Sequence, residues 1–297
     1  MDVSIIIVNY NTKDLTLQCI NSVYEKTHGI LFEVILVDNA SSDGSKELFE
    51  NDDRIIYIYS KENLGFGRAN NIGLKYAKGR NVLFLNPDTI LISNAVKFLS
   101  FFLDENSEFG ACGGNLYDAE MKPALSFKRI YPGLIDEINN LFFHIPEKLF
   151  FGKSWYHNFS SKIINAAHIS GADLMIKKMV LDKIGAFSPD FFMYYEETDL
   201  CFRIHKAGYK LISLPQVKIQ HLEGKSFQSS VNLKRLQLSE NGRMIFYKRN
   251  YTPRYIFLAN SIYIFSLYFH QLIYTLLGKN IKSETCKYKR RILFEML

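Results

Sequence analysis

The carboxylate of Asp88 follows a run of four apolar residues and the dipeptide Asn86-Pro87. The run at 82–85 is typical of a strand buried on both faces, as in a parallel sheet. Pro87 has no amide proton for a strand ladder, so Asp88 should stand just past the carboxyl end of this strand. Ligands bind at that edge in open α/β sheets, and a carboxylate there can hold a divalent cation that holds a diphosphate. On these residues alone, an aspartate that opens the next turn is the alternative.

Three further acids, Glu196, Glu197 and Asp199, come directly after the aromatic and Met residues of 191–195. We expect a helix over 200–207, and a helix dipole stabilises negative charge at or before the first turn. Capping accounts for one acid, whereas three desolvated like charges repel one another. The cluster therefore predicts a functional role for at least one of these carboxylates.

Two other strand ends carry polar or glycine-rich turns. Asp38 ends the strand at 32–37, where a carboxylate commonly accepts hydrogen bonds from a base or ribose. Capping of the next helix is the alternative, although Asp43 could fill that role. A Gly-x-Gly turn begins at Gly65, but the third glycine position holds Asn70 and the turn follows the third strand. We therefore reject a nicotinamide-binding interpretation.

Strands and helices alternate through the N-terminal part of the chain. Apolar runs rich in β-branched residues predict strands, and one-faced apolar spacing predicts helices. We expect strands at 3–8, 32–37, 54–59 and 82–85, and helices at 14–24, 45–49, 68–77 and 93–103. This alternation predicts an α/β fold with a doubly wound, mostly parallel sheet.

The rest of the chain is less regular. Residues 117–161 are rich in proline and aromatic residues, and we expect an insertion of loops and short helices that selects the substrate. His221 follows an expected strand, and taken alone it is a metal ligand or a surface or structural residue. Strands are expected at 109–114, 168–176, 209–214 and 217–220, and a helix at 179–184.

Composition bounds the class of protein. The 297 residues are 47% hydrophobic and 22% charged, as in a globular protein and unlike a disordered one. Four scattered cysteines without a Cys-x-x-Cys pair are typical of buried thiols in a reducing compartment. Asp2 stands where a signal peptide would carry basic residues, and the apolar run that follows is short. We therefore expect a cytoplasmic protein.

The net charge of +6 is concentrated in 248–297, which holds nine Lys or Arg and two Glu. A basic, aromatic segment beside a near-neutral body suits an anionic membrane surface better than a nucleic-acid groove, so we expect no nucleic-acid partner. An amphipathic helix is expected at 233–248. The stretch 255–278 carries no formal charge and is long enough to span a bilayer.

Three environments remain open for 255–278: interfacial or re-entrant membrane contact, burial against the protein or a partner, and a full span. We expect the first, which would place the protein at the inner face of the cell membrane. Four basic residues would then meet anionic lipid headgroups, namely Lys287, Lys289, Arg290 and Arg291.

In their order along the chain, these motifs resemble the family-2 glycosyltransferases, inverting nucleotide-sugar enzymes of the GT-A fold. The similarity is greatest to bacterial members that include rhamnosyltransferases. It covers roughly 3–226, and each motif alone is weak. The motifs are Ile6-Ile7-Val8-Asn9-Tyr10-Asn11, Val37-Asp38-Asn39-Ala40-Ser41-Ser42-Asp43-Gly44, Asn63-Leu64-Gly65-Phe66-Gly67, Asn86-Pro87-Asp88, Gly171-Ala172 and Glu196-Glu197-Thr198-Asp199-Leu200-Cys201-Phe202-Arg203.

The resemblance implies roles for the matching residues. Asp88 corresponds to the last acid of the family's Asp-x-Asp metal motif, and His221 matches a late metal-ligand histidine. Glu197 matches the catalytic base, with Glu196 and Asp199 as further candidates. Asp38 would contact the nucleotide base, and Arg203 with Asp199 would support the loop of the base. The nucleotide-sugar site would comprise Asn9, Asn11, Asp38, Asn63, Gly65, Asn86 and Arg203.

Two residues depart from the family pattern. Asn86 replaces the first aspartate of the metal motif, so Asp88 and His221 would hold most of the metal. Glu197 replaces the usual aspartate and adds a methylene. The implied chemistry is consistent, because a divalent cation neutralises a departing diphosphate and a partly desolvated carboxylate removes the acceptor proton. In-line attack opposite the leaving group inverts the anomeric carbon.

The sequence thus predicts an inverting glycosyltransferase that depends on Mg²⁺ or Mn²⁺. It would move a sugar from a UDP- or dTDP-linked donor to a hydroxyl of a glycan or lipid-linked acceptor in surface polysaccharide biosynthesis. Residues 1–230 would form the GT-A domain, with 117–161 as a variable acceptor-side insertion, and 231–297 a helical, membrane-associating extension. The alternative is a non-catalytic nucleotide-sugar-binding or scaffold protein at the membrane. In that case Asn86 and Glu197 would differ from the family pattern because catalytic activity has been lost.

Overall fold

The computed structural model describes residues 1–222 and 232–296. Contacts between Cα atoms divide the chain into two compact units. The first comprises 1–129, 153–192 and 196–225, and the second comprises 130–152, 193–195 and 226–297, each as far as it is described. The chain therefore passes between the units more than once.

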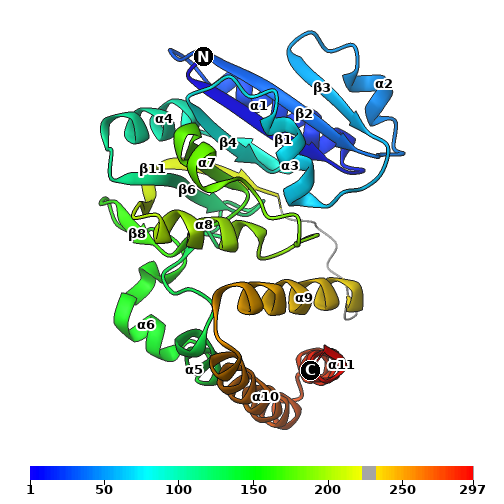
Figure 1. The fold of residues 1–297 in the computed structure, drawn as a ribbon, viewed down its shortest axis with the longest axis vertical. Helices are drawn as coiled ribbons and strands as arrows, with labels where there is room; N and C mark the ends of the chain where they lie inside the picture. Colours follow the sequence, from blue (N-terminus) through cyan, green and yellow to red (C-terminus); the bar gives the residue numbers. More distant parts are fainter. Residues whose placement is uncertain (223–231, 297) are drawn as a thin grey trace. The chain divides into compact units, whose positions relative to one another are not determined.

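Within the described residues, the first unit is built on a nine-stranded sheet in the order β3-β2-β1-β4-β10-β6-β11-β5, with β8 paired to β11 (Figure 1). Two short strands, β7 (Phe127–Lys128) and β9 (His168–Ile169), pair separately. The strands of the main sheet are β1 (Val3–Asn9), β2 (Phe32–Asn39), β3 (Ile55–Ser60), β4 (Asn81–Leu85), β5 (Thr89–Leu91), β6 (Phe109–Tyr117), β8 (Ile164–Ala166), β10 (Asp173–Lys177) and β11 (Lys210–His221).

The strands β3, β2, β1 and β4 are mutually parallel. In contrast, β10 runs antiparallel to both β4 and β6, and β5 runs antiparallel to β11. The prediction of an α/β fold with a mostly parallel sheet is confirmed. β8 also runs antiparallel to β11. The alternation of strands and helices in the sequence carries no signal for these reversed strands.

Helices cover both faces of this sheet. Ile5 and Ile7 of β1 share a buried cluster with residues of α1 (Lys13–Lys26), α2 (Ser45–Phe49) and α4 (Ala95–Glu105). Ile6 and Val8 share the other buried cluster with residues of α3 (Phe66–Leu74), α7 (Lys178–Ile184) and α8 (Glu196–Lys206). Because successive side chains of a strand point to opposite faces, burial on both sides accounts for the unbroken apolar runs of β1 and β4.

Several elements differ from the expected ones. β11 is one strand rather than two, because Pro215 and Gln216 lie within a shift of register instead of a turn. α8 begins at Glu196 rather than at 200, so the acids lie inside its first turn. β5, directly after Asp88, was not expected. The four cysteines are free and buried, as predicted.

The second unit is helical where it is described (Figure 1). Its helices are α5 (Leu134–Leu141), α6 (Ile145–Phe151), α9 (Leu233–Asn250), α10 (Pro253–Leu276) and α11 (Asn280–Met296). A 3-10 turn at Gly152–Trp155 follows α6 and leads into the first unit. The side chains of Asn232 and Thr252 cap α9 and α10, and Pro253 occupies the first turn of α10. By length and composition α10 could cross a membrane, with 33% of its apolar window buried in the protein, but a core helix passes the same test.

This division groups 130–152, expected in the insertion at 117–161, with the C-terminal helices. The expected domain boundary after residue 230 and the end of the resemblance at Ser226 lie outside the described residues. That the chain consists of a transferase domain and a membrane-associating extension stays a prediction.

A buried ion cluster joins three helices of the second unit. The Arg243 guanidinium of α9 donates to Glu137 of α5 at 3.0 Å, to Glu240 at 3.2 Å and to Asn260 of α10 at 2.8 Å. The Arg243 side chain is 5% exposed. Burial raises the pKa of Glu137 to about 7, and Tyr247 donates a further hydrogen bond to that carboxyl group. The cluster therefore ties α5, α9 and α10 together through charge-assisted hydrogen bonds.

α9 also packs against a strained turn of the same unit. Tyr194 and Tyr195 both have a φ of 72°, in the left-handed region that residues with side chains rarely adopt. A Cβ added at Gly242 of α9 would stand 2.5 Å from the Tyr194 carbonyl oxygen, and the Tyr195 ring lies 6.1 Å from that of Phe246. The next residue along the chain, Glu196, begins α8 in the first unit.

Replacing the central cation should destabilise the second unit. Arg243→Met leaves Glu137 and Glu240 buried without their partner, which should lower the free energy of unfolding by about 3–5 kcal/mol. Urea unfolding followed by circular dichroism measures the change. Lys234→Met, at an exposed position of α9, serves as the control. Equal midpoints for the two variants would contradict a stabilising role for the cluster.

Candidate active site

The carboxyl ends of three neighbouring parallel strands bring polar residues together. Asn9 and Asp38 are register partners at the ends of β1 and β2. Asn86 directly follows β4, which pairs with the other side of β1. Residues that are far apart in the sequence therefore meet at the sheet edge where a ligand was predicted.

Asn9 and Asn11 organise the loops that follow β1 and β2. Asn9 is fully buried. Its Oδ1 accepts hydrogen bonds from the Thr12 backbone amide and hydroxyl, and its Nδ2 donates to the Ser41 hydroxyl at 3.1 Å. Asn11 accepts from the Ser42 amide at 2.8 Å. Both asparagines thus frame the predicted nucleotide site, and direct contact with a nucleotide stays a prediction.

Asp38 is held from two sides. Its Oδ1 accepts from the Ser41 amide at 2.9 Å and its Oδ2 from the Tyr57 hydroxyl at 2.8 Å. Burial and the bond to Asp38 raise the pKa of Tyr57, so the phenol keeps its proton and continues to donate. Asp38 is 0% exposed, although a carboxylate oxygen can accept a second hydrogen bond. The expected contact of Asp38 with a nucleotide base stays a prediction.

The turn at Gly65 is fixed by Asn63, whose Oδ1 accepts from the Gly65 amide and from the Asn39 side chain, both at 2.9 Å. Gly65 has a φ of 80°, and a side chain there would collide with the Phe192 carbonyl oxygen. The Phe192 carbonyl oxygen accepts a hydrogen bond from the Phe66 backbone amide at 3.0 Å. The turn requires glycine for both its backbone conformation and this close approach.

Asp88, His221 and Asn86 form a compact polar group. His221 Nε2 lies 3.1 Å from Asp88 Oδ1 and 3.3 Å from Asn86 Nδ2. The Leu222 amide also donates to the Asp88 carbonyl at 2.8 Å, so the end of β11 is fixed beside Asp88. In the part of the chain that the structure describes, no three His, Cys, Asp or Glu side chains are arranged to hold a metal ion. A carboxylate beside an imidazole can nevertheless hold a divalent cation that phosphate oxygens also bind.

The three acids of α8 have different environments. Glu196 is 4% exposed, and its Oε2 has no hydrogen-bond partner within the described residues. Burial and the neighbouring Glu197 raise the pKa of Glu196 well above its usual value. Burial also raises the pKa of Glu197, but backbone amides and Thr198 oppose this shift, and the residue is partly exposed. Burial therefore disfavours the charged form of Glu196 more strongly than that of Glu197, and Glu197 is the more exposed of the two.

Asp199 is ion-paired and nearly inaccessible. Arg203 Nε donates to its carboxylate at 2.8 Å, and the Asp199 side chain is 1% exposed. The Arg203 guanidinium also donates to the backbone carbonyls at 184–186. The pair therefore connects α8 to the end of α7, and Glu197 is the most accessible of the three acids.

Glu197 and Asn86 contact two consecutive residues, Gly171 and Ala172. A Cβ at Gly171 would be 3.6 Å from Glu197 Cβ, and the Ala172 carbonyl accepts from the Asn86 amide at 3.1 Å. Since β10 is antiparallel to β4, its start lies where β4 ends. Glu197 therefore lies at the sheet edge that carries Asp88.

Sequence reasoning missed two supports of the site, Tyr57 and Ser41. Tyr57 lies on β3, where Asp38 is the register partner of Tyr59, so the side chain of Tyr57 reaches Asp38 diagonally across the strands. Strand register is the one signal that could identify it. Ser41 lies within the motif at 37–44, but the sequence pattern predicts no role for it.

Residues 4–185 match the family model described as glycosyl transferase family 2. This match covers more than half of the chain. The chain belongs to glycosyl transferase family 2. The narrower rhamnosyltransferase-like subgroup is not shown by this match.

Three family relatives are informative. The low-salt glycan biosynthesis hexosyltransferase Agl10 of Haloferax volcanii is 29% identical over 214 residues, which are 71% of this chain and 64% of Agl10. The Escherichia coli UDP-Glc:alpha-D-GlcNAc-diphosphoundecaprenol beta-1,3-glucosyltransferase WfaP is 37% identical over 103 residues, 33% of this chain and 41% of WfaP. Rhamnosyltransferase WbbL of Escherichia coli K12 is 26% identical over 210 residues, 67% of this chain and 76% of WbbL. The chain thus spans less than two thirds of Agl10 and of WfaP.

Among solved structures, the mannosyltransferase PcManGT of Pyrobaculum calidifontis, in complex with GDP-Man and Mn²⁺, superposes with a TM-score of 0.59. The match covers 99% of this chain and 86% of that one, at 17% identity. At 17% identity this superposition shows a shared fold and nothing more. The fold of this family-2 chain is GT-A-like.

We expect Glu197→Gln to keep donor binding and to lower turnover by roughly 10²–10⁴-fold, the contribution typical of a general base. Because the pKa of Glu197 is raised above 4.5, wild-type turnover should rise with pH through a range above that value as the base loses its proton. Glu196→Gln, the matched control, should lower turnover far less, because Glu196 is nearly buried and its raised pKa disfavours the charged form. Steady-state kinetics with calorimetric donor binding provide the measurement. An unchanged rate in Glu197→Gln would move the base to Glu196 or Asp199.

Proposed function

We propose that this chain transfers a sugar from a nucleotide-diphosphate donor to an acceptor hydroxyl, with inversion at the anomeric carbon. The observation that carries the proposal is that Asp88, with His221 and Asn86, lies at the same sheet edge as the accessible carboxylate of Glu197. Transfer requires one group beside the leaving diphosphate and another beside the incoming hydroxyl. Membership of the family supports the reaction class.

The leaving-group side is assigned to Asp88 and His221, with Asn86 beside them. These residues would hold Mg²⁺ or Mn²⁺, and such a cation supplies positive charge to a departing diphosphate. The related mannosyltransferase structure was determined with Mn²⁺, which supports this choice. The loops framed by Asn9, Asp38 and Gly65 would bind the nucleoside.

The acceptor side is assigned to Glu197. Its carboxylate would take the proton of the attacking hydroxyl, because its raised pKa makes it a stronger base than an exposed glutamate. The raised pKa of Glu196 disfavours a second negative charge beside the incoming oxygen. Attack opposite the diphosphate inverts the anomeric carbon.

Relatives support a role in surface polysaccharide biosynthesis with a glycan or lipid-linked acceptor. The name of WfaP specifies a UDP-sugar donor and a diphosphoundecaprenol-linked acceptor. The name of WbbL specifies transfer of rhamnose, a deoxyhexose, and dTDP is the second carrier that the resemblance in the sequence implies. We therefore propose a UDP- or dTDP-linked donor.

A screen of UDP-, dTDP- and GDP-sugars for release of the nucleotide diphosphate tests the function. We expect a UDP- or dTDP-sugar to be cleaved with Mg²⁺ or Mn²⁺ and the activity to be lost on chelation. Asp88→Ala should lower turnover by roughly 10²-fold or more, the scale for removal of one group that stabilises developing charge. Asp182→Ala, at an exposed aspartate of α7, is the control.

Two results would contradict the proposal. Retention of donor configuration in the product, determined by NMR, would contradict inversion. Donor binding without cleavage of any donor in the screen would favour the non-catalytic binding protein.

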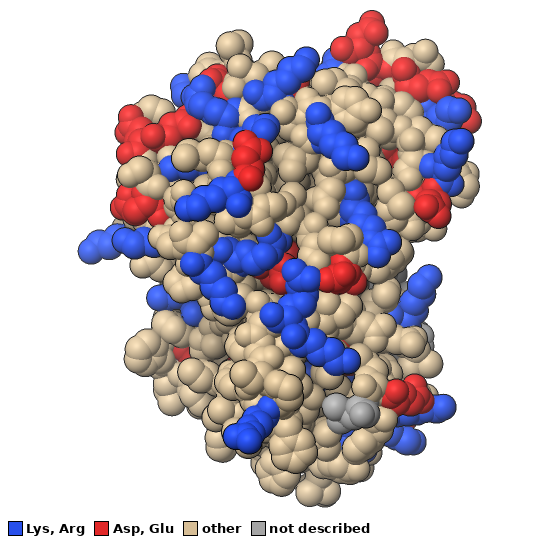
Figure 2. Space-filling model, viewed as in Figure 1, with Lys and Arg blue, Asp and Glu red and all other residues tan. Residues whose placement is uncertain are grey.

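We also propose that the second unit binds the inner face of the cell membrane. On the face drawn in Figure 2, the surface over this unit consists mainly of uncharged residues with Lys and Arg among them. Exposed large apolar side chains occur on α5, α6 and α10, including Ile135, Ile145, Leu149, Phe150, Phe257, Phe265, Leu272 and Leu276. Contact with lipid would bury this apolar area, which water otherwise covers.

Four of the basic residues of α11, at 287 and 289–291, divide into two pairs. Arg290 stacks on Tyr268 at 3.8 Å and Lys289 lies 3.6 Å from Glu240, so both contact other helices of the unit. The side chains of Lys287 and Arg291 are 61% and 76% exposed. Of the four residues expected to meet lipid headgroups, Lys287 and Arg291 are therefore the better candidates.

Charges placed on the exposed face of α10 should prevent membrane binding. The double variant Phe265→Glu/Leu272→Glu should lose co-sedimentation with vesicles that contain phosphatidylglycerol, because glutamate is costly to insert and is repelled by anionic lipid. Phe101→Glu, at an exposed phenylalanine of α4, is the control. Undiminished sedimentation of the double variant would exclude this face as the membrane contact.

A further inference from the structure

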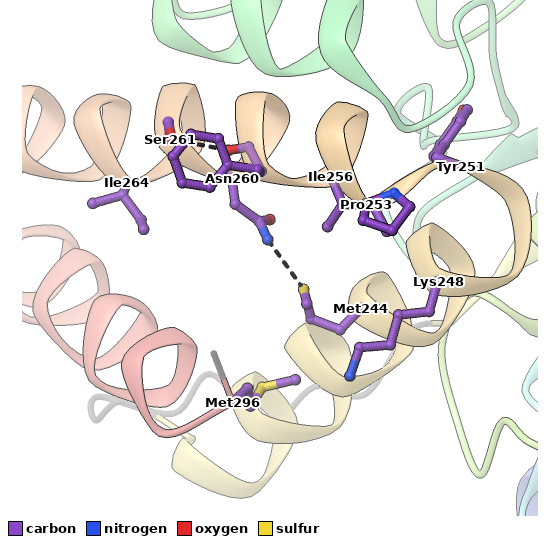
Figure 3. Close-up of a pocket in the computed structure, with 10 residues that line it drawn as sticks. Met244, Lys248, Tyr251, Pro253, Ile256, Asn260, Ser261, Ile264 and Met296 are labelled. Carbon is purple, nitrogen blue, oxygen red and sulfur yellow. Dashed lines mark hydrogen bonds between the residues drawn. The ribbon is translucent and has the colours of Figure 1, made fainter.

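A cavity of about 470 Å³ opens within the second unit, between α9, α10 and the end of α11 (Figure 3). Its lining is mainly apolar and includes Met244, Pro253, Ile256, Phe257, Ile264 and Met296. Small-molecule sites commonly have this size and character. The residues of the candidate active site lie in the first unit, so this cavity is distinct from it.

The polar side chains of the cavity wall already have partners inside the protein. Asn260 Oδ1 accepts from Arg243 at 2.8 Å. The Ser261 hydroxyl donates to the backbone carbonyl one turn earlier at 2.8 Å, and the Tyr251 hydroxyl donates to the Pro132 carbonyl at 2.6 Å. An occupant therefore meets apolar surface rather than free donors and acceptors, and water in the cavity would find few partners.

Lys248 is the charged side chain of the lining as far as the structure describes it. It is exposed and forms no ion pair with another described residue. Figure 3 shows Lys248 extending from α9 alongside the cavity toward Met296. The cavity thus combines an apolar wall with one ammonium group at its rim.

We infer that this cavity binds the hydrocarbon chain of a lipid phosphate, with the phosphate beside Lys248. An apolar wall with one cation at its rim complements a molecule that joins a flexible apolar chain to an anionic head. Phe257, 74% exposed, belongs both to the lining and to the outer apolar face of α10. A chain can therefore pass from the lipid-facing surface into the cavity. The inference rests on the proposed function, in which the lipid phosphate carries the acceptor.

Calorimetric titration of the full chain with farnesyl phosphate tests the site, and farnesol and inorganic phosphate probe each half of the ligand. We expect farnesyl phosphate to bind and either half alone to bind at least tenfold more weakly. Lys248→Glu should weaken farnesyl phosphate binding at least tenfold by reversing the rim charge. Ile256→Trp should do the same by filling the cavity. Arg254→Glu makes the same charge change on α10 outside the lining and should leave the affinity unchanged.

Failure of the wild-type chain to bind farnesyl phosphate would overturn the inference. Equal losses in Lys248→Glu and Arg254→Glu would also overturn it, because the attraction would then be general to the basic surface. Unfolding midpoints of the variants distinguish loss of the site from loss of the fold. If Ile256→Trp does not fold, the comparison of Lys248→Glu with Arg254→Glu decides.

Two further arms identify the ligand source and separate the inference from the proposed function. If phosphatidylglycerol vesicles bind through Lys248 and Ile256 while farnesyl phosphate does not bind, the cavity takes a two-chain membrane phospholipid instead of the single-chain lipid phosphate inferred here, and the inference is wrong. Hydrolysis of the sugar donor should persist in both cavity variants. A chain that binds farnesyl phosphate but cleaves no donor contradicts the proposed function alone. A chain that cleaves donor without binding farnesyl phosphate contradicts the cavity assignment alone.

Discussion

The candidate active site depends on the antiparallel pairing of β10 with β4. In this register Asp173 lies opposite Leu85, and the Ala172 carbonyl accepts the Asn86 amide. The start of β10 is therefore fixed at the edge where β4 ends. A parallel β10 would put its start at the opposite edge, roughly 16 Å away for a strand of this length. Glu197, which lies against Gly171, would then be separated from Asp88.

Several carboxyl groups lie near the same edge, and burial disfavours the charged form of two of them. Burial raises the pKa of Asp173 well above its usual value, and burial together with Glu197 does the same for Glu196. Asp199 is neutralised by Arg203 at 2.8 Å. Each of these acids is kept from adding an uncompensated charge, so the repulsion that three neighbouring acids suggest is largely absent. Glu197 is left as the partly exposed carboxylate of the cluster.

The sequence is most informative where structure is local. The apolar runs that become β1 to β4 and the position of Asp88 after β4 follow from residue types over a few positions. The reversal of β10 does not, because a short apolar strand has the same pattern in either direction. Arg243 and Glu137 are 106 positions apart, so their pairing depends on tertiary packing that no local pattern records. Pro215 suggested a break in β11, whereas a shift of register accommodates it.

The strained turn at Tyr194 and Tyr195 packs against α9 and directly precedes the acids of α8. Two left-handed residues in sequence cost of order 1–3 kcal/mol each, and packing elsewhere must offset that cost. Gly242 and Phe246 of α9 supply this packing, and one peptide bond later the chain enters the first turn of α8 at Glu196. A truncated protein without α9 would lose this support, and the turn would relax toward ordinary backbone angles. The support that α9 gives to this turn therefore ends one residue before the acids of α8 begin.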